Sequence, residues 1–161
     1  MNDRTALLHD LLKLTNRLMA PFSTHLSHQY RISLNEFRLL MTIGALGRTA
    51  SHEVAELTGV NAMSISRAVA TLERDGRVEV STDTGNRRRK WLRLTEEGQR
   101  LYAAMRPSTD VVADYLLADL DPGDLAAFDR IVHRLIARLE AVDGEGRLAF
   151  VEATRPADDE A

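Results

Sequence analysis

The densest charge in the chain is a basic block that reads Arg-Arg-Arg-Lys-Trp-Leu-Arg over residues 87–93. Arginine and lysine form charge-assisted hydrogen bonds to phosphate oxygens, and arginine also enters narrow minor grooves of duplex DNA. Neighbouring like charges are unfavourable unless a polyanion compensates them. We therefore favour DNA contact over a merely solvated polar hairpin for four basic residues: Arg87, Arg88, Arg89 and Lys90.

Residue types for enzymatic chemistry are sparse. The chain has no cysteine, which excludes disulfides, thiolate metal sites and a cysteine nucleophile. Its five histidines form no His-Glu-x-x-His motif, and neither a phosphate-cradling glycine loop nor a nucleophile elbow is present. His25 and His28 are spaced to share a helical face, but they lack further metal ligands. We predict no enzyme, no metal and no cofactor.

Composition indicates one globular functional unit. Of 161 residues, 44% are hydrophobic and 28% charged, and the net charge is -3. That net charge by itself disfavours nucleic acid, but the basic block is concentrated locally. Neither a signal peptide nor an apolar run of about 20 residues is visible, so we expect a cytoplasmic protein.

Helical periodicity dominates the first half of the chain. Leucines recur at helical spacing over residues 5–26, where Pro21 is expected to kink or divide the helix. A capping box at Ser33 predicts a second helix that ends at Gly47, with a face of Phe37, Leu40, Ile43 and Leu46. A short helix over residues 51–57, capped by Ser51, and a longer one over residues 61–75 follow.

The periodicity then changes. Residues 78–81 and 91–95 alternate apolar and polar side chains around a polar turn, which predicts a β-hairpin. A helix capped by Thr95 follows and continues past Pro107, where another kink is expected. The last helix starts at Asp121-Pro122 and reaches Val142. Beyond Gly144 the periodicity fades into a polar tail, in which Leu148, Phe150 and Val151 could still pack, and we expect disorder from Thr154.

The two helices before the hairpin have the spacing of a helix-turn-helix. Ala55 allows a close helix crossing, Gly59 supplies the tight turn and Ile65 pins the second helix onto the first. A basic hairpin directly after them predicts a winged helix-turn-helix. Side chains off the predicted buried row are candidates for the major groove, with self-capping as the alternative for the serines. They are Asn61, Met63, Ser64, Ser66 and Arg67.

These segments resemble the MarR-type (multiple antibiotic resistance) regulators over about residues 7–142. The most specific stretch is Asp83-Thr-Gly-Asn-Arg-Arg-Arg-Lys-Trp-Leu-Arg-Leu-Thr-Glu-Glu-Gly98, which is similar to the family's wing with its acid, paired arginines and Leu-Thr-x-x-Gly. The residues before that wing, Ser66-Arg67 and Leu72-Glu-Arg-Asp-Gly76, also resemble the family's recognition helix and its end.

The chain departs from that family at Asn86, where the residue before the paired arginines is usually Asp. We hypothesise that Asp83 supplies the bracing carboxylate for Arg87 and that Arg88 enters the minor groove. The alternative is that the two arginines have the opposite roles, with Arg88 braced by the carboxylate and Arg87 in the minor groove.

The resemblance implies a homodimer, and the apolar stripes of the terminal helices independently need a partner surface. The expected fold class is mainly α with a small β-hairpin wing. Residues 33–95 are assigned to the DNA-binding region, residues 1–32 and 96–143 to a helical dimerisation region, and residues 144–161 to a polar tail.

The resemblance also implies an effector site where the first, second and fifth helices meet, for an aromatic carboxylate or its acyl thioester. Apolar walls and cationic or hydrogen-bonding groups on those segments suit such an anion, although ordinary packing is the alternative for each. The candidates are Phe22, His25, Leu26, His28, Tyr30, Phe37, Arg38 and Tyr102.

The sequence therefore predicts a transcriptional regulator, a ligand-responsive repressor that binds a pseudo-palindromic double-stranded operator with half-sites about 10 bp apart. The alternatives are an activator or effector-independent regulator, or a helical dimeric interaction module without DNA affinity.

Overall fold

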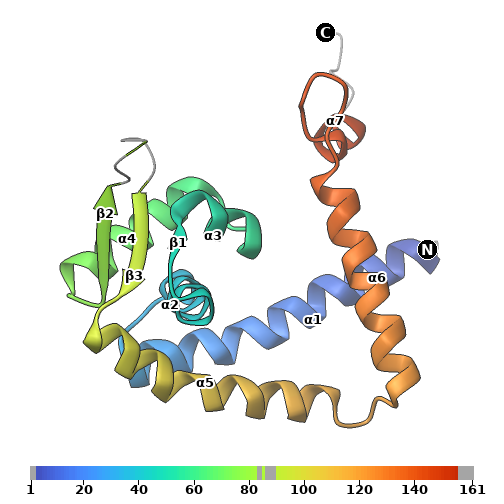
Figure 1. Cartoon of the computed structure of the whole chain (residues 1–161). Coiled ribbons are helices and arrows are strands. Elements are labelled where there is room, and N and C mark those ends of the chain that lie inside the picture. The colour runs from blue at the N-terminus through green and yellow to red at the C-terminus, as the bar shows by residue number, and fades with distance from the viewer. Residues whose placement is uncertain (1–2, 83–84, 86–89, 156–161) are drawn as a thin grey trace, which may run out of the picture. The chain divides into compact units, whose positions relative to one another are not determined.

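A computed structural model of the chain describes residues 3–82, 85 and 90–155. It contains two compact units, residues 1–109 and 110–161. The first unit contains α1 (Asp3–His25), the π-helix η1 (Leu26–Tyr30), α2 (Leu34–Leu46), β1 (Thr49–Ala50), α3 (Ser51–Thr58), α4 (Ala62–Arg74), β2 (Val78–Thr82), β3 (Lys90–Leu94) and the start of α5 (Glu96–Leu117). The second holds the end of α5, α6 (Pro122–Glu140) and α7 (Ala149–Thr154). The mainly helical fold class with a small hairpin is confirmed (Figure 1).

Most helix starts lie at the predicted caps. The Ser33 hydroxyl accepts the Glu36 amide at 3.3 Å, while the Glu36 carboxylate accepts the Ser33 amide at 2.9 Å. At the start of α5, the Thr95 hydroxyl accepts the Gly98 amide at 3.1 Å and donates to the Gly76 carbonyl at 2.7 Å. Asp121 caps α6 by accepting two backbone amides. Each cap satisfies amides that the first helical turn leaves without a partner.

The predicted cap of α3 is wrong. Ser51 is already the first residue of the helix, and its N-cap is Ala50. The Glu53 carboxylate takes over by accepting the Ala50 amide and the Thr49 hydroxyl, both at 2.8 Å. An acid in the first turn thereby replaces the missing side-chain cap and suits the positive end of the helix dipole.

Pro21 does not divide the first helix, because α1 continues through it to His25. A proline removes only one backbone hydrogen bond, which a long helix tolerates. Pro107 likewise lies inside an uninterrupted α5. The irregularity comes later, where the chain widens into η1 and Arg31 closes it with a left-handed φ of 54°.

The β-hairpin belongs to a three-stranded antiparallel sheet in the order β1-β3-β2. Val78 pairs with Leu94 and Val80 with Leu92, so the predicted alternation and register hold. The sequence did not predict β1, in which Thr49 pairs with Leu92 and Ala50 with Trp91. Two residues are too short to give a period-two signal, and their strand conformation depends on the partner strand.

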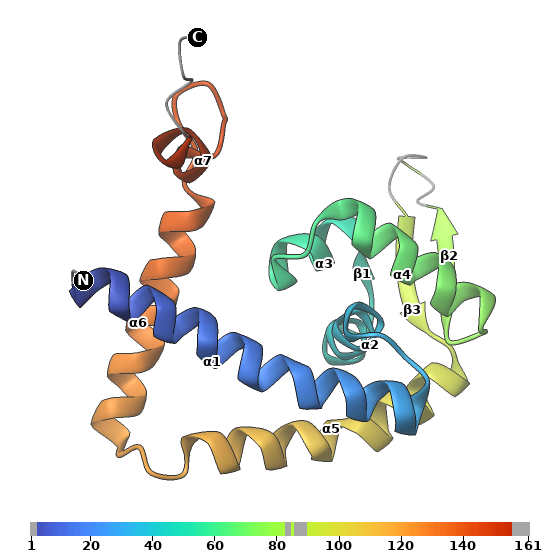
Figure 2. The same ribbon diagram turned by 180° about the vertical axis from the view of Figure 1, so that it is seen from behind.

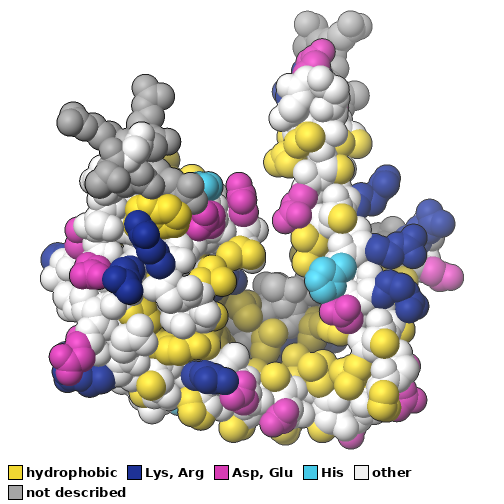
Figure 3. Space-filling model, in the orientation of Figure 1, with side chains coloured by type: hydrophobic (Ala, Val, Ile, Leu, Met, Phe, Trp, Pro, Cys, Tyr) yellow, Lys and Arg dark blue, Asp and Glu magenta, His cyan; other side chains and the backbone are white. Residues whose placement is uncertain are grey.

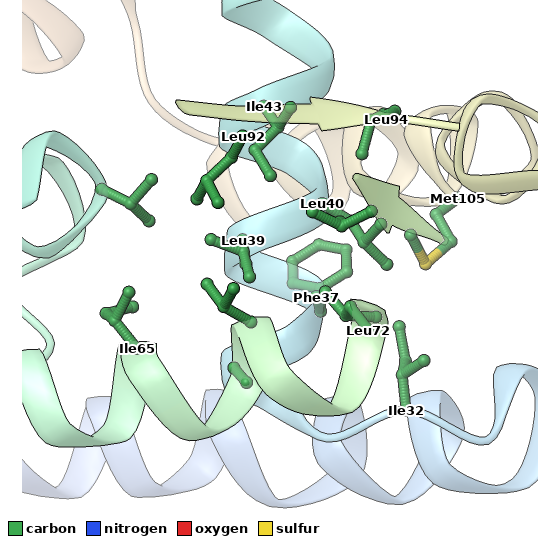
Figure 4. Packing of buried hydrophobic residues seen from close by; sticks show 14 of the residues in the cluster. Ile32, Phe37, Leu39, Leu40, Ile43, Ile65, Leu72, Leu92, Leu94 and Met105 are labelled. Atoms are coloured by element: carbon green, nitrogen blue, oxygen red, sulfur yellow. The ribbon is translucent and has the colours of Figure 1, made fainter. Parts of the chain in front are cut away.

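The core of the first unit lies between α2, α4 and the sheet. Figure 4 shows Phe37 of α2 surrounded by core side chains from α4, β3 and α5, among them Leu72 and Met105. The predicted face of α2 needs one correction, since Leu46 is 55% exposed while Leu39 is fully buried. Helix α2 is covered on more than one side, by α3 and α4 as well as β3, which widens its buried face. Figure 2 shows it from behind, between α1 and the group of α3, α4 and the strands.

In the second unit, helix α6 contributes no buried residue. Its apolar stripe is exposed, and hydrophobic side chains are visible at the surface of this unit in Figure 3. The exposed members are Leu125, Phe128, Ile131, Leu135, Ile136 and Leu139. The stripe is therefore a surface that the unit itself leaves uncovered.

The polar tail expected after Gly144 contains a helix that the sequence did not predict, α7. Val142 bridges to Leu148, and the Asp143 carboxylate accepts the Arg147 amide at 2.9 Å and the Glu145 amide at 2.8 Å. The hydrogen bond from the Arg147 amide is the main cause that lowers the pKa of Asp143. A short helix held by such a turn lacks the long apolar period by which helices are recognised in a sequence.

None of the helices in the described part of the chain is long and apolar enough to span a membrane.

Candidate nucleic-acid interface

Helices α3 and α4 form the predicted helix-turn-helix. Gly59 ends α3 with a left-handed φ of 65°, a conformation that a side chain disfavours. Ile65 of α4 is fully buried, and Ala55 of α3 packs against the same core. The three positions therefore have the structural roles that their spacing predicted.

Helix α4 has one buried and one exposed side. Its buried row is Ile65, Ala68, Val69 and Leu72. Of the predicted DNA contacts, Met63, Ser66 and Arg67 are exposed, whereas Ser64 is half-buried. Asn61 is exposed as well, but its side-chain oxygen caps the helix by accepting the Ser64 amide at 2.9 Å. The exposed side is free to meet a major groove, and Ser64 is its least accessible candidate.

A contact that the sequence analysis missed joins two of these residues. The Arg67 guanidinium donates from Nη2 to Met63 Sδ at 3.5 Å. Their i,i+4 spacing places them on one face of the helix, which was the available signal. Met63 is 66% exposed, so this apolar side chain is accessible on the same face as Arg67.

The wing is described only at its base. Lys90 is the first residue of β3, exposed and paired with Thr82 of β2. The predicted bracing acid and the three arginines of the wing lie outside the described residues: Asp83, Arg87, Arg88 and Arg89.

The outer face of the sheet carries further cations. Arg48 lies over the ring of Trp91, with its guanidinium carbon 4.1 Å from the ring centroid, in a cation-π contact. An open cavity of about 450 Å³ is lined there by Arg48, Glu79, Val80, Ser81 and Arg93. Arg48 was overlooked because the segment before α3 was not recognised as a strand next to the hairpin.

The apolar candidates for the effector site lie together near the end of α1. Phe22 packs edge-on against Phe37 with ring centroids 4.9 Å apart. Leu26 and Phe37 are buried in the core, while Tyr30 and Tyr102 pack against it. The Tyr102 ring lies so close to Gly44 that a Cβ there would come within 2.4 Å of it.

The polar candidates lie on the same or adjoining elements. His25 and His28 are exposed, and the His25 ring lies 6.1 Å from Tyr30. Tyr30 donates a 3.5 Å hydrogen bond to the Ala104 carbonyl of α5. Arg38 is half-buried and donates to Asn35 at 3.1 Å and to Met19 Sδ at 3.9 Å. The structure thus groups the aromatic candidates of α1, η1, α2 and α5 around one core, with His25 beside Tyr30 and Arg38 beside Met19.

Within residues 3–82, 85 and 90–155, no three acidic, histidine or cysteine side chains gather to form a possible metal site.

Residues 32–90 match the model of the MarR family. The chain is 26% identical over 98 residues to the HTH-type transcriptional regulator YwaE of Bacillus subtilis, which covers 61% of this chain and 57% of that protein. It is 27% identical over 101 residues to the HTH-type transcriptional repressor NicR of Pseudomonas putida, covering 63% and 64% respectively. The matched stretches therefore span less than two thirds of either relative.

Solved structures share the fold at lower identity. A MarR/EmrR family transcriptional regulator from an Acinetobacter species has a TM-score of 0.78 at 21% identity, covering 87% of this chain and 99% of that one. FabT of Streptococcus pneumoniae, crystallised with DNA, has a TM-score of 0.70 at 18% identity, covering 86% and 98%. BpsR of Bordetella bronchiseptica, whose DNA binding is regulated by 6-hydroxynicotinic acid, has a TM-score of 0.70 at 19% identity, covering 81% and 98%.

Proposed function

We propose that this chain, whose residues 32–90 match the model of the MarR family, is a transcriptional regulator that binds double-stranded DNA as a homodimer. The observation that carries the proposal is the exposed side of α4, which presents polar and cationic side chains while the opposite side is buried. The base of a basic hairpin follows it in the same unit. Such a helix fits the major groove, and the hairpin contacts the adjoining backbone or minor groove.

The proposed role needs DNA binding alone, and we propose no catalytic activity for this chain. A cytoplasmic location remains part of the proposal. The direction of regulation is proposed as repression, by analogy with the relative NicR, which is a repressor.

The test is equilibrium binding of the full chain to its selected operator at several salt concentrations. Binding is expected to fall steeply with salt, because each neutralised phosphate releases a counterion. Arg88→Ala should weaken binding by about 1–3 kcal/mol and leave the melting temperature unchanged, because a wing arginine contacts DNA rather than the core.

Arg134→Ala is the matched control, since Arg134 is exposed on α6. It removes the same charge outside the proposed interface and is expected to leave operator affinity unchanged. Equal affinity of folded Arg88→Ala and the wild type contradicts the wing assignment. Absence of any salt-dependent duplex binding instead supports the alternative of a dimeric interaction module.

The finer part of the proposal is control by a small aromatic carboxylate or its acyl thioester. Two features support a site at the end of α1: η1 is a π-helix, a conformation enriched at functional sites, and Arg31 has a strained positive φ. The exposed His25 lies beside Tyr30, and Arg38 and the exposed His28 offer further cationic or hydrogen-bonding groups on α2 and η1. By analogy, BpsR is regulated by an aromatic carboxylate, 6-hydroxynicotinic acid.

We expect aromatic acids or their thioesters, titrated into the operator complex, to release DNA and to raise the melting temperature of the free protein. A ligand that binds only the folded state stabilises it by mass action, and release requires preferential binding to the conformation with low operator affinity. Arg38→Met keeps an unbranched side chain but removes the charge, so it should weaken the ligand's effect while leaving operator affinity intact. The mechanism is contradicted if only oxidants or metals release the DNA, or if none of the compounds releases it.

A further inference from the structure

The exposed side of α4 carries a combination of side chains that suits a defined pair of bases. Met63 is 66% exposed, and Arg67 is exposed one helical turn later. Between them only Ser66 is also exposed, since Ile65 is buried and Ser64 is half-buried. The apolar and cationic members of this surface are therefore Met63 and Arg67.

Asn61 differs from these two because its carboxamide has another task. A bidentate contact to adenine needs both the oxygen and the nitrogen of the amide. The Asn61 oxygen already accepts the Ser64 amide at 2.9 Å as the cap of α4. Breaking that cap would leave a helix amide without its partner, which ties the Asn61 carboxamide to the helix end, so the proposed unit is built on Met63 and Arg67.

Met63 and Arg67 are held together before any DNA arrives. The 3.5 Å contact from Arg67 Nη2 to Met63 Sδ places the guanidinium beside the thioether. Four residues along a helix correspond to about 6 Å, which is less than two base steps of about 3.4 Å each. The two side chains can therefore reach the same or neighbouring base pairs.

This inference rests on the proposed function. We propose that Met63 and Arg67 together form one reading unit, that is, a pair of side chains that recognises a guanine and a thymine no more than two base steps apart. Arginine pairs with guanine O6 and N7 in the major groove, and the thymine methyl is the apolar group that a major-groove side chain can cover. Met63 supplies the apolar contact to that methyl and orients the Arg67 guanidinium.

The test begins with selection of the preferred operator from random duplexes by the full chain. Each thymine of a half-site is then replaced by deoxyuridine, which removes only the methyl group, and each guanine by 7-deazaguanine, which removes only N7. One deoxyuridine position is expected to weaken wild-type binding about four-fold, the value of one buried methyl group. A guanine within two steps of it should lose about five-fold or more on 7-deaza replacement.

The variants assign these positions to side chains. Met63→Ala should lose the sensitivity to deoxyuridine at that position and should also show a reduced sensitivity to 7-deazaguanine, because Met63 orients Arg67. Arg67→Ala should lose the sensitivity to 7-deazaguanine. Both residues are exposed, so circular dichroism and melting temperature are expected to match the wild type. Leu57→Ala is the control, because Leu57 is also 66% exposed but belongs to α3. It should keep both sensitivities.

The two proposals fail differently. If the wild type selects no duplex and shows no salt-dependent binding, the proposed DNA-binding function is wrong. If it selects an operator but Met63→Ala keeps every deoxyuridine sensitivity of the wild type, or no such position exists, the reading unit is wrong while the DNA-binding function stands.

Discussion

Gly98→Ala is expected to lower the free energy of unfolding by about 2–3 kcal/mol, the cost of overpacking a tightly packed site. A Cβ at Gly98 would lie 2.0 Å from the Arg77 carbonyl oxygen and 3.3 Å from the Leu94 Cβ. The first of these atoms is backbone, which also accepts the Thr95 amide at 3.1 Å, so it cannot move without disturbing the start of α5. Chemical denaturation of the full chain measures the loss.

Gly144→Ala is the matched control, because a Cβ there meets nothing within 4 Å. Its effect on the free energy of unfolding is expected to stay within about 0.5 kcal/mol, as for other open surface positions. The higher helix propensity of alanine works against the predicted loss at Gly98 by about 1 kcal/mol at most. A Gly98→Ala protein as stable as the wild type would show that α5 does not pack on the Arg77 backbone as the structure has it.

Leu135→Asp is expected to convert the proposed dimer into monomers. Leu135 is 46% exposed within the apolar stripe of α6, which the unit leaves uncovered. Burying an unpaired carboxylate costs about 3 kcal/mol, and a two-fold symmetric interface contains the substitution twice. The total of about 6 kcal/mol corresponds to roughly four orders of magnitude in the dissociation constant. Sedimentation equilibrium over a range of protein concentrations measures it.

Ala137→Asp introduces the same carboxylate on the opposite side of α6, near Arg130 and Arg134 by helical periodicity. It is expected to leave the association state unchanged. Loss of dimers in both variants would indicate a general effect of added negative charge. A Leu135→Asp protein that dimerises like the wild type would exclude this stripe from the interface.

Features that depend on neighbouring residues were predictable from the sequence. The capping box at Ser33, the cap at Asn61 and the left-handed Gly59 follow from local hydrogen bonds and backbone preferences. The hairpin alternation also held, with Val78 paired to Leu94. Such signals span three to five residues or a simple period, so no knowledge of the distant chain is needed to interpret them.

The candidate site was predictable only in part, because some of its features depend on contacts that local sequence signals do not describe. Helical periodicity separated the buried Ile65 from the exposed Met63 and Arg67, but not the half-buried Ser64 from its exposed neighbours. The contact between Arg67 and Met63 required side-chain conformations that spacing alone does not define. Arg48 could not be placed beside Trp91 until β1 was known to pair with β3.

By itself the sequence determined the turn at Gly59 between the helices of the helix-turn-helix, the cap of α4 at Asn61, which side of α4 is buried, and that a hairpin follows it. Only the tertiary structure decided that residues 49–50 form a strand, that α1 passes through Pro21 into a π-helix, and that Leu39 rather than Leu46 is buried. These outcomes depend on which distant element packs against each segment. Pairing partners and covered faces arise from contacts across the chain, which local propensity and periodicity do not encode.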